Sequence, residues 1–282
     1  MPTAALRTVK LPSGEPISAL GLGTWHFAED PRLRDQEIEA IRTGLDLGMS
    51  LIDTAEMYAD GAAEELVGEA IDGRREGVFL VSKVLPQHAT ARGTIAACEA
   101  SLARLRTDVV DLYLLHWRGP VPLAETLEAF VELVEAGRIR HWGVSNLDVE
   151  DMAELVELPG GEAVQTDQVL YNLNRRGTEL DLLPWCRERG IPIMAYSPLE
   201  LGRLAHEPAL TGIATSHGAT PAQAALAWVL AQEGVVAIPR SHDPRHVRED
   251  REALDLRLAP DELADLDRAF PPPPEPVPLE MH

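Results

Sequence analysis

The sequence lacks the features that mark membrane, disulfide-stabilised and zinc-binding proteins. No stretch approaches the ~18 unbroken apolar residues that span a bilayer, and the N-terminus MPTAALRTVK has no apolar signal-peptide core. The two cysteines, Cys98 and Cys186, lie far apart and have no CxxC or Cys/His spacing, which argues against a disulfide framework or a zinc site. We therefore expect a cytoplasmic protein with two reduced thiols and no bound metal.

Positive charge is also scarce. The 25 Lys and Arg residues are outnumbered by 46 Asp and Glu residues, which gives a formal net charge of -21 at pH 7. Such a surface repels phosphate backbones and anionic lipid, so nucleic acids and membranes are poor partners. Hydrophobic residues make up 45% of the chain, enough for a substantial core, and the 282 residues match one closed α/β barrel of roughly 250 residues. We expect residues 1–282 to form a single domain.

A complete glycine-rich dinucleotide motif is missing as well. The GLG at residues 21–23 lacks a third glycine and no helix pattern starts there, which removes the main sequence support for a doubly wound open sheet. Apolar strand-like runs alternate with amphipathic helix patterns instead. With residues 19–23 as the first strand, there are eight strands, the number of a (β/α)8 TIM barrel. The other strands are expected at 51–53, 78–83, 109–115, 139–145, 163–168, 191–197 and 235–239, and the helices between them at 35–47, 62–71, 93–104, 123–135, 149–158, 180–189 and 221–231.

Additional segments flank the predicted barrel. Residues 7–18 alternate around a Pro-Ser-Gly turn, which predicts a β-hairpin that caps the barrel floor. Two helix patterns, at 245–253 and 260–270, follow the eighth strand. Residues 271–282, PPPPEPVPLEMH, are too proline-rich to pair as a central strand. This segment is expected to be either a loose tail or a flap over the barrel rim.

Four side chains suited to carbonyl chemistry lie at the ends of strand-like runs. Asp53 and Lys83 each end a run, His116 directly follows one, and Tyr58 lies in the loop after Asp53. In a strand-helix barrel these ends face the active site. We expect Asp53 to hold Lys83 in an ion pair, Lys83 to lower the pKa of Tyr58, and His116 to orient a carbonyl oxygen by a hydrogen bond. Each residue alone is compatible with a structural role, such as capping or charge neutralisation, but the combination favours catalysis.

Three sequence motifs carry a resemblance to a known family. LIDTAEMY at 51–58, LARLRTDVVDLYLLHW at 102–117 and IPRS at 238–241 resemble signatures of the aldo-keto reductases, in particular the bacterial reductases of methylglyoxal and related small aldehydes. The resemblance implies a monomer with a catalytic tetrad of Asp53, Tyr58, Lys83 and His116. It also implies a nicotinamide cofactor that delivers hydride to the carbonyl carbon while Tyr58 protonates the oxygen.

The resemblance further implies the residues that contact cofactor and substrate. Ser145, Asn146 and Gln168 would hold the carboxamide, Tyr196 would stack on the nicotinamide ring, and residues 238–241 would grip the adenosine 2'-phosphate. The full cofactor set is Gly23, Thr24, Trp25, Asp53, Ser145, Asn146, Gln168, Tyr196, Ser197, Pro198, Leu199, Ile238, Pro239, Arg240, Ser241, His246, Glu249 and Asp250. The substrate pocket would be formed by Trp25, Tyr58, His116 and Trp117.

The sequence departs from the family pattern at several cofactor positions. Arg240 replaces the usual lysine, His246 a frequent arginine, Asp250 an asparagine that often contacts adenine, and Asp167 a frequent asparagine near the carboxamide. Arg240 can bind a phosphate as a fork, whereas Asp250 would repel one nearby. We therefore expect NADPH as the preferred cofactor, with NADH as an alternative.

Two other functions are compatible with a barrel of this kind. One is a redox-sensing barrel that binds a nicotinamide cofactor with little turnover. The other is a hydrolase that uses Asp53, Glu56 and Asp60 as paired carboxylates, although this scheme leaves Lys83 without a purpose. Turnover of cofactor with small aldehydes would distinguish a reductase from both alternatives.

Overall fold

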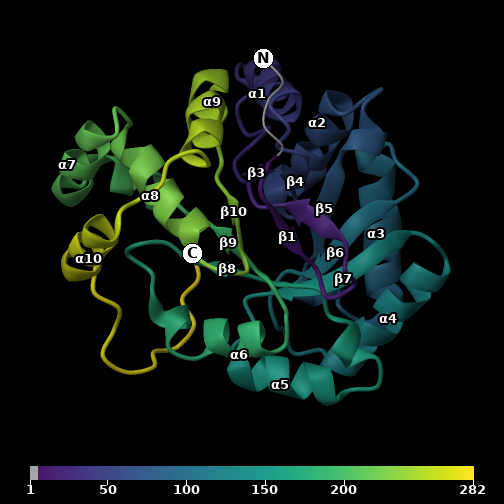
Figure 1. The fold of residues 1–282 in the computed structure, drawn as a ribbon. Helices are drawn as coiled ribbons and strands as arrows, with labels where there is room; N and C mark the ends of the chain where they lie inside the picture. The colour runs from purple at the N-terminus through teal and green to yellow at the C-terminus, as the bar shows by residue number, and fades with distance from the viewer. Residues whose placement is uncertain (1–5) are drawn as a thin grey trace.

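A computed structural model describes residues 6–282 (Figure 1). Its centre is an eight-stranded sheet in which each strand pairs in parallel with the next along the chain. A parallel bridge between Leu20 and Ala237 joins the first strand to the last, so the sheet closes into the predicted barrel. The strands are β3 (Gly21–Gly23), β4 (Leu51–Asp53), β5 (Phe79–Val84), β6 (Val110–Leu115), β7 (Ile139–Ser145), β8 (Asp167–Leu170), β9 (Ile193–Tyr196) and β10 (Val235–Ile238).

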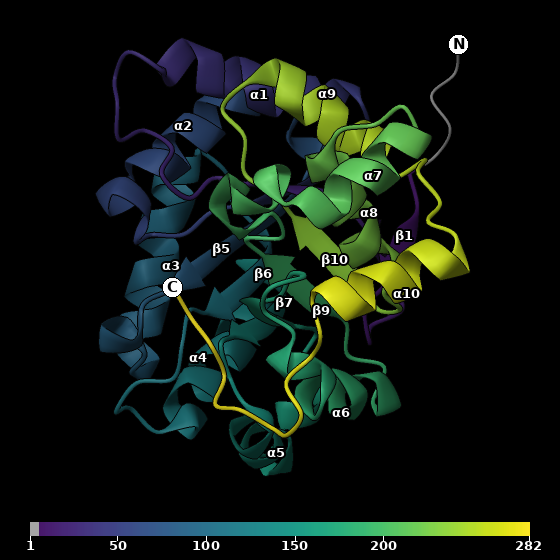
Figure 2. The same ribbon diagram turned by 90° about the vertical axis from the view of Figure 1, so that its left-hand side faces the viewer.

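Helices surround the barrel and bury their apolar faces against it (Figures 1 and 2). They are α1 (Arg34–Asp46), α2 (Ala62–Ala70), α3 (Ala91–Leu105), α4 (Leu123–Glu135), α5 (Val149–Glu157), α6 (Leu182–Glu188), α7 (Pro208–Ser216), α8 (Pro221–Ala231), α9 (Pro244–Ala253) and α10 (Pro260–Ala269). Short 3-10 helices are η1 (Tyr58–Gly61), η2 (Arg75–Gly77), η3 (Pro86–His88), η4 (Gly161–Ala163), η5 (Gly177–Glu179) and η6 (Glu200–His206). None of the described helices is long and apolar enough to span a membrane.

The predicted hairpin closes the barrel floor. Its strands are β1 (Thr8–Lys10) and β2 (Pro16–Ser18), which pair antiparallel. Ile17 and Leu11 form one apolar cluster with side chains from the barrel interior, including Leu51 and Val236. The hairpin is therefore a plug whose apolar residues complete the interior core, as predicted.

Two predictions of secondary structure were wrong. The sixth strand of the barrel, β8, begins at Asp167 rather than at 163 and continues to Leu170, so Gln168 lies within the strand rather than at its end. The sequence analysis also missed η6 and α7, which follow β9 and bury Leu210 and Ile213. Glycine and threonine weaken the helical pattern of α7, and its helical state depends on packing against α8.

The proline-rich segment 271–282 crosses the mouth of the barrel. In Figure 2 this yellow segment leaves α10 and turns beside α6 and α5, and residues 277–280 line a small cavity together with the first residues of those helices. Its last residues, Met281 and His282, line the main pocket. The segment therefore lies over the rim, in agreement with the flap interpretation, and we call residues 271–282 the C-terminal tail.

Candidate active site

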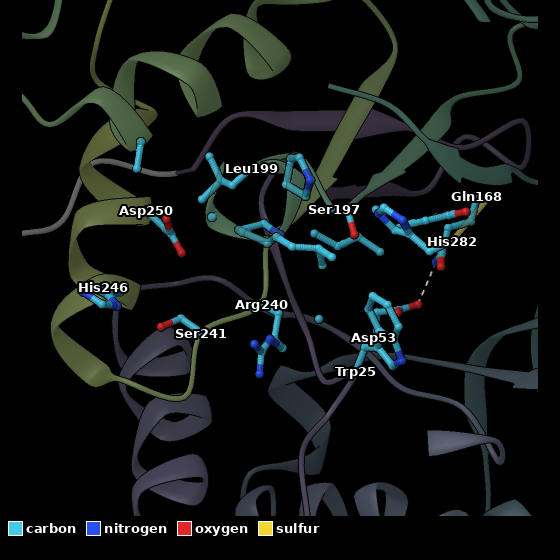
Figure 3. Close-up of a pocket in the computed structure, with 18 of the residues that line it drawn as sticks. Trp25, Asp53, Gln168, Ser197, Leu199, Arg240, Ser241, His246, Asp250 and His282 are labelled. Atoms are coloured by element: carbon cyan, nitrogen blue, oxygen red, sulfur yellow. Dashed lines mark hydrogen bonds between the residues drawn. The ribbon is translucent and has the colours of Figure 1, made fainter. Parts of the chain in front are cut away.

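A groove with a volume of about 770 Å³ opens at the carboxyl ends of the barrel strands (Figure 3). Every residue predicted to contact cofactor, substrate or the reacting groups lines this groove, apart from Thr24 and Lys83. One end holds Asp53, Gln168, Trp25 and His282, and the other holds Ser241, His246 and Asp250 (Figure 3). Such an elongated shape suits a long ligand whose two ends have different chemistry.

The predicted ion pair lies beneath the first end of the groove. Lys83 Nζ donates hydrogen bonds to Asp53 Oδ2 at 2.7 Å, to the Thr54 carbonyl at 2.8 Å and to Tyr58 Oη at 3.1 Å. Lys83 is fully buried, so these three acceptors replace water for all three of its N–H groups. Gln168 Nε2 donates to the other oxygen, Asp53 Oδ1, at 2.7 Å. The lysine is therefore fixed within hydrogen-bond reach of the tyrosine.

The loop after β4 places Tyr58 in this contact. Ala59 and Asp60 adopt left-handed backbone angles, with φ of 48° and 51°, and Gly61 has φ of 88° before α2 begins. Such angles are costly for residues other than glycine and are typical of functional loops held by their surroundings. The side chain of Glu56 helps to fix this loop, because its Oε1 accepts a hydrogen bond of 2.7 Å from the Leu85 N–H after β5.

The pKa of Tyr58 differs in direction from our expectation. Burial and, secondarily, the Asp53 carboxylate raise the pKa of Tyr58 well above its ordinary value, so the net shift is opposite to the lowering that we expected from Lys83. The Lys83 ammonium lies 2.7 Å from the Asp53 carboxylate, whose negative charge largely offsets the effect of the ammonium on Tyr58. Burial also lowers the pKa of Lys83, an effect that the pairing with Asp53 opposes. Tyr58 therefore keeps its proton at neutral pH.

His116 approaches Tyr58 edge-on, with ring centroids 5.8 Å apart and planes at 75°. Burial and the nearby Lys83 charge lower the pKa of His116 well below its ordinary value. A neutral imidazole has one N–H donor, which suits a hydrogen bond to a carbonyl oxygen without transfer of charge. Tyr58 and His116 thus provide two neutral donors at one end of the groove.

A hydrogen-bonded chain of polar residues borders the reacting groups. Asn146 Nδ2 donates to Ser145 Oγ at 3.0 Å and to the His116 carbonyl at 3.1 Å, and Ser145 Oγ donates to the Gln168 carbonyl at 2.7 Å. Tyr196 Oη donates to Asn146 Oδ1 at 3.0 Å, which fixes the phenol ring at the end of β9. These residues form a rigid polar wall that would suit the recognition of an amide.

Three of the four residues that differ from the family pattern, Arg240, His246 and Asp250, line the groove away from Asp53 and Gln168. Arg240 is exposed and forms no ion pair with the described residues, so its guanidinium is available for an anion. Asp250 is buried, and burial together with the Glu249 carboxylate raises the pKa of Asp250 to about 7. Near neutral pH a large fraction of Asp250 is therefore uncharged.

Several residues differ from their expected positions. Thr24 is fully buried and its hydroxyl donates to the Asp53 carbonyl at 3.0 Å, so it does not face the groove. Asp167 is buried away from the groove as well, because neighbouring residues of β8 point to opposite faces and Gln168 points inward. Groove residues that the sequence analysis missed are Met57, Leu201, Gly202, Ala205, Thr220, Pro221, Ala222, His242, Met281 and His282. Most of these come from η6, α8 and the tail, whose paths depend on long-range packing.

Comparisons with known proteins agree with this geometry. Residues 19–270 match the family model described as the aldo/keto reductase family. The chain is 51% identical over 270 residues to the methylglyoxal reductase YeaE of Escherichia coli K12, covering 94% of this chain and 95% of that protein. It is 34% identical over 270 residues to the glyoxal reductase of Bacillus subtilis 168, covering 95% of this chain and 94% of that protein. Among solved structures, an aldo/keto reductase of Klebsiella pneumoniae in complex with NADP and acetate superposes with a TM-score of 0.96 at 50% identity, covering 99% of this chain and 100% of that chain.

Proposed function

Because the chain belongs to the aldo/keto reductase family, we propose that it reduces small aldehydes and ketones such as methylglyoxal to alcohols, with NADPH as its preferred cofactor. The observation that carries this proposal is the buried contact of Lys83 with both Asp53 and Tyr58 at the groove. The methylglyoxal reductase of E. coli, which matches nearly the whole chain, supports the choice of substrate.

In the proposed reaction Tyr58 is the general acid. The bound nicotinamide cofactor supplies the hydride, and the protein provides orientation and the proton. His116 donates a hydrogen bond to the carbonyl oxygen, and Tyr58 Oη transfers its proton to the same oxygen as negative charge develops there. The Lys83 ammonium, 3.1 Å from Tyr58 Oη, then stabilises the phenolate that remains. Asp53 holds the lysine in place throughout.

The groove also suits NADPH. Ser145, Asn146 and Gln168 lie at the reacting end and would hold the carboxamide, beside the fixed ring of Tyr196. Gly23, which also lines the groove, allows β3 to approach the end of β10 closely, since a Cβ atom at this position would lie 3.0 Å from the Ile238 carbonyl oxygen. Arg240, which has no ion pair within residues 6–282, lies toward the other end and would bind the 2'-phosphate. The Klebsiella relatives were solved in complex with NADP and with NADPH.

Substitution of Tyr58 by phenylalanine tests the proposal. Turnover of NADPH with methylglyoxal, followed by the loss of reduced-nicotinamide absorbance, is expected to fall by about 10²- to 10⁴-fold, while NADPH binding by fluorescence titration stays unchanged. Tyr113→Phe is the matched control because the Tyr113 hydroxyl is buried without a partner among the described residues. That variant should keep its activity.

Three outcomes would contradict parts of the proposal. An active Tyr58→Phe enzyme would remove Tyr58 from the role of acid. Tight NADPH binding by the wild-type protein, without turnover of methylglyoxal or a panel of small aldehydes, would favour the redox-sensing barrel instead. Tighter binding of NADH than of NADPH would overturn the cofactor preference.

A further inference from the structure

The C-terminal tail forms one wall of the groove at its reacting end. The His282 ring stacks on Trp25, with centroids 5.8 Å apart and planes at 20°, and lies 6.1 Å from the Tyr196 ring. Like Gln168, His282 lines this end of the groove (Figure 3). Residues at the carbonyl end of the proposed active site therefore include His282, whose position depends on how the tail is held.

Arg175 holds the tail close to its end. Its Nη1 donates to Glu280 Oε1 at 2.5 Å, two residues before the C-terminus. The same guanidinium donates to Glu200 Oε1, from Nη2 at 3.0 Å and from Nε at 3.2 Å. Arg175 thus bridges two carboxylates, one in the tail and one in the segment after β9.

Glu200 belongs to a strained loop that lines the groove. Ser197, Glu200 and Leu201 have left-handed φ angles of 48°, 48° and 55°, which residues other than glycine adopt only when their surroundings impose them. Asn172 provides one constraint, because its Nδ2 donates to the Ser197 carbonyl at 2.9 Å and to Glu200 Oε2 at 2.7 Å. Arg175 provides the other through Glu200 Oε1. The conformation of this loop is therefore tied to the orientation of Arg175.

The two contacts of Arg175 differ in how readily they can open. The Glu200 side chain is 3% exposed and has hydrogen bonds from two residues, so breaking its contacts would leave a buried charge short of partners. The Glu280 side chain is 39% exposed, and half-exposed ion pairs are weak and reversible. The contact of Arg175 with Glu280 in the tail therefore breaks more readily than its contact with Glu200 in the loop.

We propose that Arg175 is a positioning residue that couples the loop of residues 197–201 on the cofactor side to the C-terminal tail on the carbonyl side. The coupling rests on the proposed function, in which Ser197 and Leu199 contact the cofactor. When a bound cofactor holds the loop, Glu200 fixes the guanidinium of Arg175, which in turn fixes Glu280 and places His282 against Trp25. Cofactor binding thereby completes the carbonyl pocket before the substrate enters.

Carboxypeptidase digestion of the intact protein tests the coupling without relying on catalysis. The release of His282 and Met281 is followed by mass spectrometry with and without saturating NADPH, in the wild type, in Glu280→Gln and in Glu275→Gln. Glu275 is the matched control because it is an exposed tail glutamate with no ion pair among the described residues. NADPH affinity and the KM for methylglyoxal are measured for each variant.

NADPH is expected to slow the release of His282 in the wild type and in Glu275→Gln. In Glu280→Gln the NADPH affinity should stay within about twofold of the wild-type value. The protection of His282 by NADPH should be lost. The KM for methylglyoxal should rise about twofold to fivefold, which is the effect expected from loss of a half-exposed ion pair. Gly177→Ala provides an independent way to displace the tail, because a Cβ atom at residue 177 would lie 2.7 Å from Val277 Cγ2 in the tail and within 4 Å of no other residue. The Gly177→Ala variant should also lose the protection of His282 by NADPH.

Protection of His282 that persists in Glu280→Gln, or that is missing in the wild type, would overturn the coupling. The two proposals can fail separately. If NADPH binds and protects the tail but no aldehyde is reduced, only the reductase function is contradicted. If NADPH does not bind the wild type, both proposals are contradicted.

Discussion

Replacing Asp250 with asparagine is expected to change how stability depends on pH. Asp250 is 6% exposed, in α9, and its pKa is raised from 3.8 to about 7 by burial and by Glu249. Below about pH 4 the carboxyl is protonated in both the folded and unfolded states and contributes no pH dependence. Between pH 4 and 7 the unfolded chain releases this proton while the folded protein keeps it, so the free energy of unfolding falls. Above pH 7 Asp250 ionises in the folded protein as well, so the free energy of unfolding no longer falls through this group.

The size of the effect follows from the pKa difference. A change from 3.8 to about 7 is about 3 pKa units, and each unit corresponds to about 1.4 kcal/mol, so the wild type loses up to about 4 kcal/mol between pH 4 and pH 8 through this group. Asparagine does not titrate, so the variant should not show this loss. We expect the free energy of unfolding of Asp250→Asn, relative to the wild type, to rise by about 3 kcal/mol between pH 5 and pH 8.

Urea denaturation of both proteins at pH 5, 6, 7 and 8, without cofactor, measures this difference. Glu249→Gln is the companion variant, since removal of that charge should lower the pKa of Asp250 and reduce the pH dependence. Parallel stability curves for the wild type and Asp250→Asn would refute the reasoning, because they would mean that Asp250 has the same pKa in the folded and unfolded states.

Three further substitutions have expected outcomes. Lys83→Met should abolish turnover and lower the free energy of unfolding by about 3–5 kcal/mol at pH 8, since Asp53 would be a buried charge without its cation. A decrease in the free energy of unfolding of less than about 1 kcal/mol, measured by denaturant unfolding, would contradict this. Gly68→Ala should destabilise the protein by about 1–3 kcal/mol, because the new Cβ would lie 2.8 Å from backbone atoms of Leu105, and an unchanged melting temperature would contradict it. Thr220→Ala, which removes the N-cap of α8, should cost about 0.5–2 kcal/mol by chemical denaturation, whereas Thr220→Ser should retain most of the stability.

The locations of the reacting groups were predictable because they depend on local patterns. Asp53 ends β4 and His116 follows β6, as the ends of the apolar runs indicated. Parallel strands in a barrel bring their carboxyl ends to one rim, so residues 30 or more positions apart in the sequence could be grouped before their contacts were known. The contact of Lys83 with Asp53 and Tyr58 bears out this grouping.

The direction of the Tyr58 pKa shift was not predictable in the same way. It depends on the balance between burial, the Asp53 carboxylate and the Lys83 ammonium, and this balance depends on distances and solvent exclusion rather than on residue type. The same holds for Asp250, whose pKa reflects the packing of α9 and not the identity of a neighbouring motif.

The sequence by itself determined the barrel, its hairpin floor and the residues at its rim, because hydrophobic periodicity and strand ends are properties of short segments. Only the tertiary structure decided the path of residues 200–216 and of the C-terminal tail, since neither has a strong local pattern. Their positions arise from contacts over long sequence separations, such as Arg175 with Glu280 and His282 with Trp25. The end of the groove beside Asp53 and Trp25 is therefore completed by residues whose placement the sequence pattern does not encode locally.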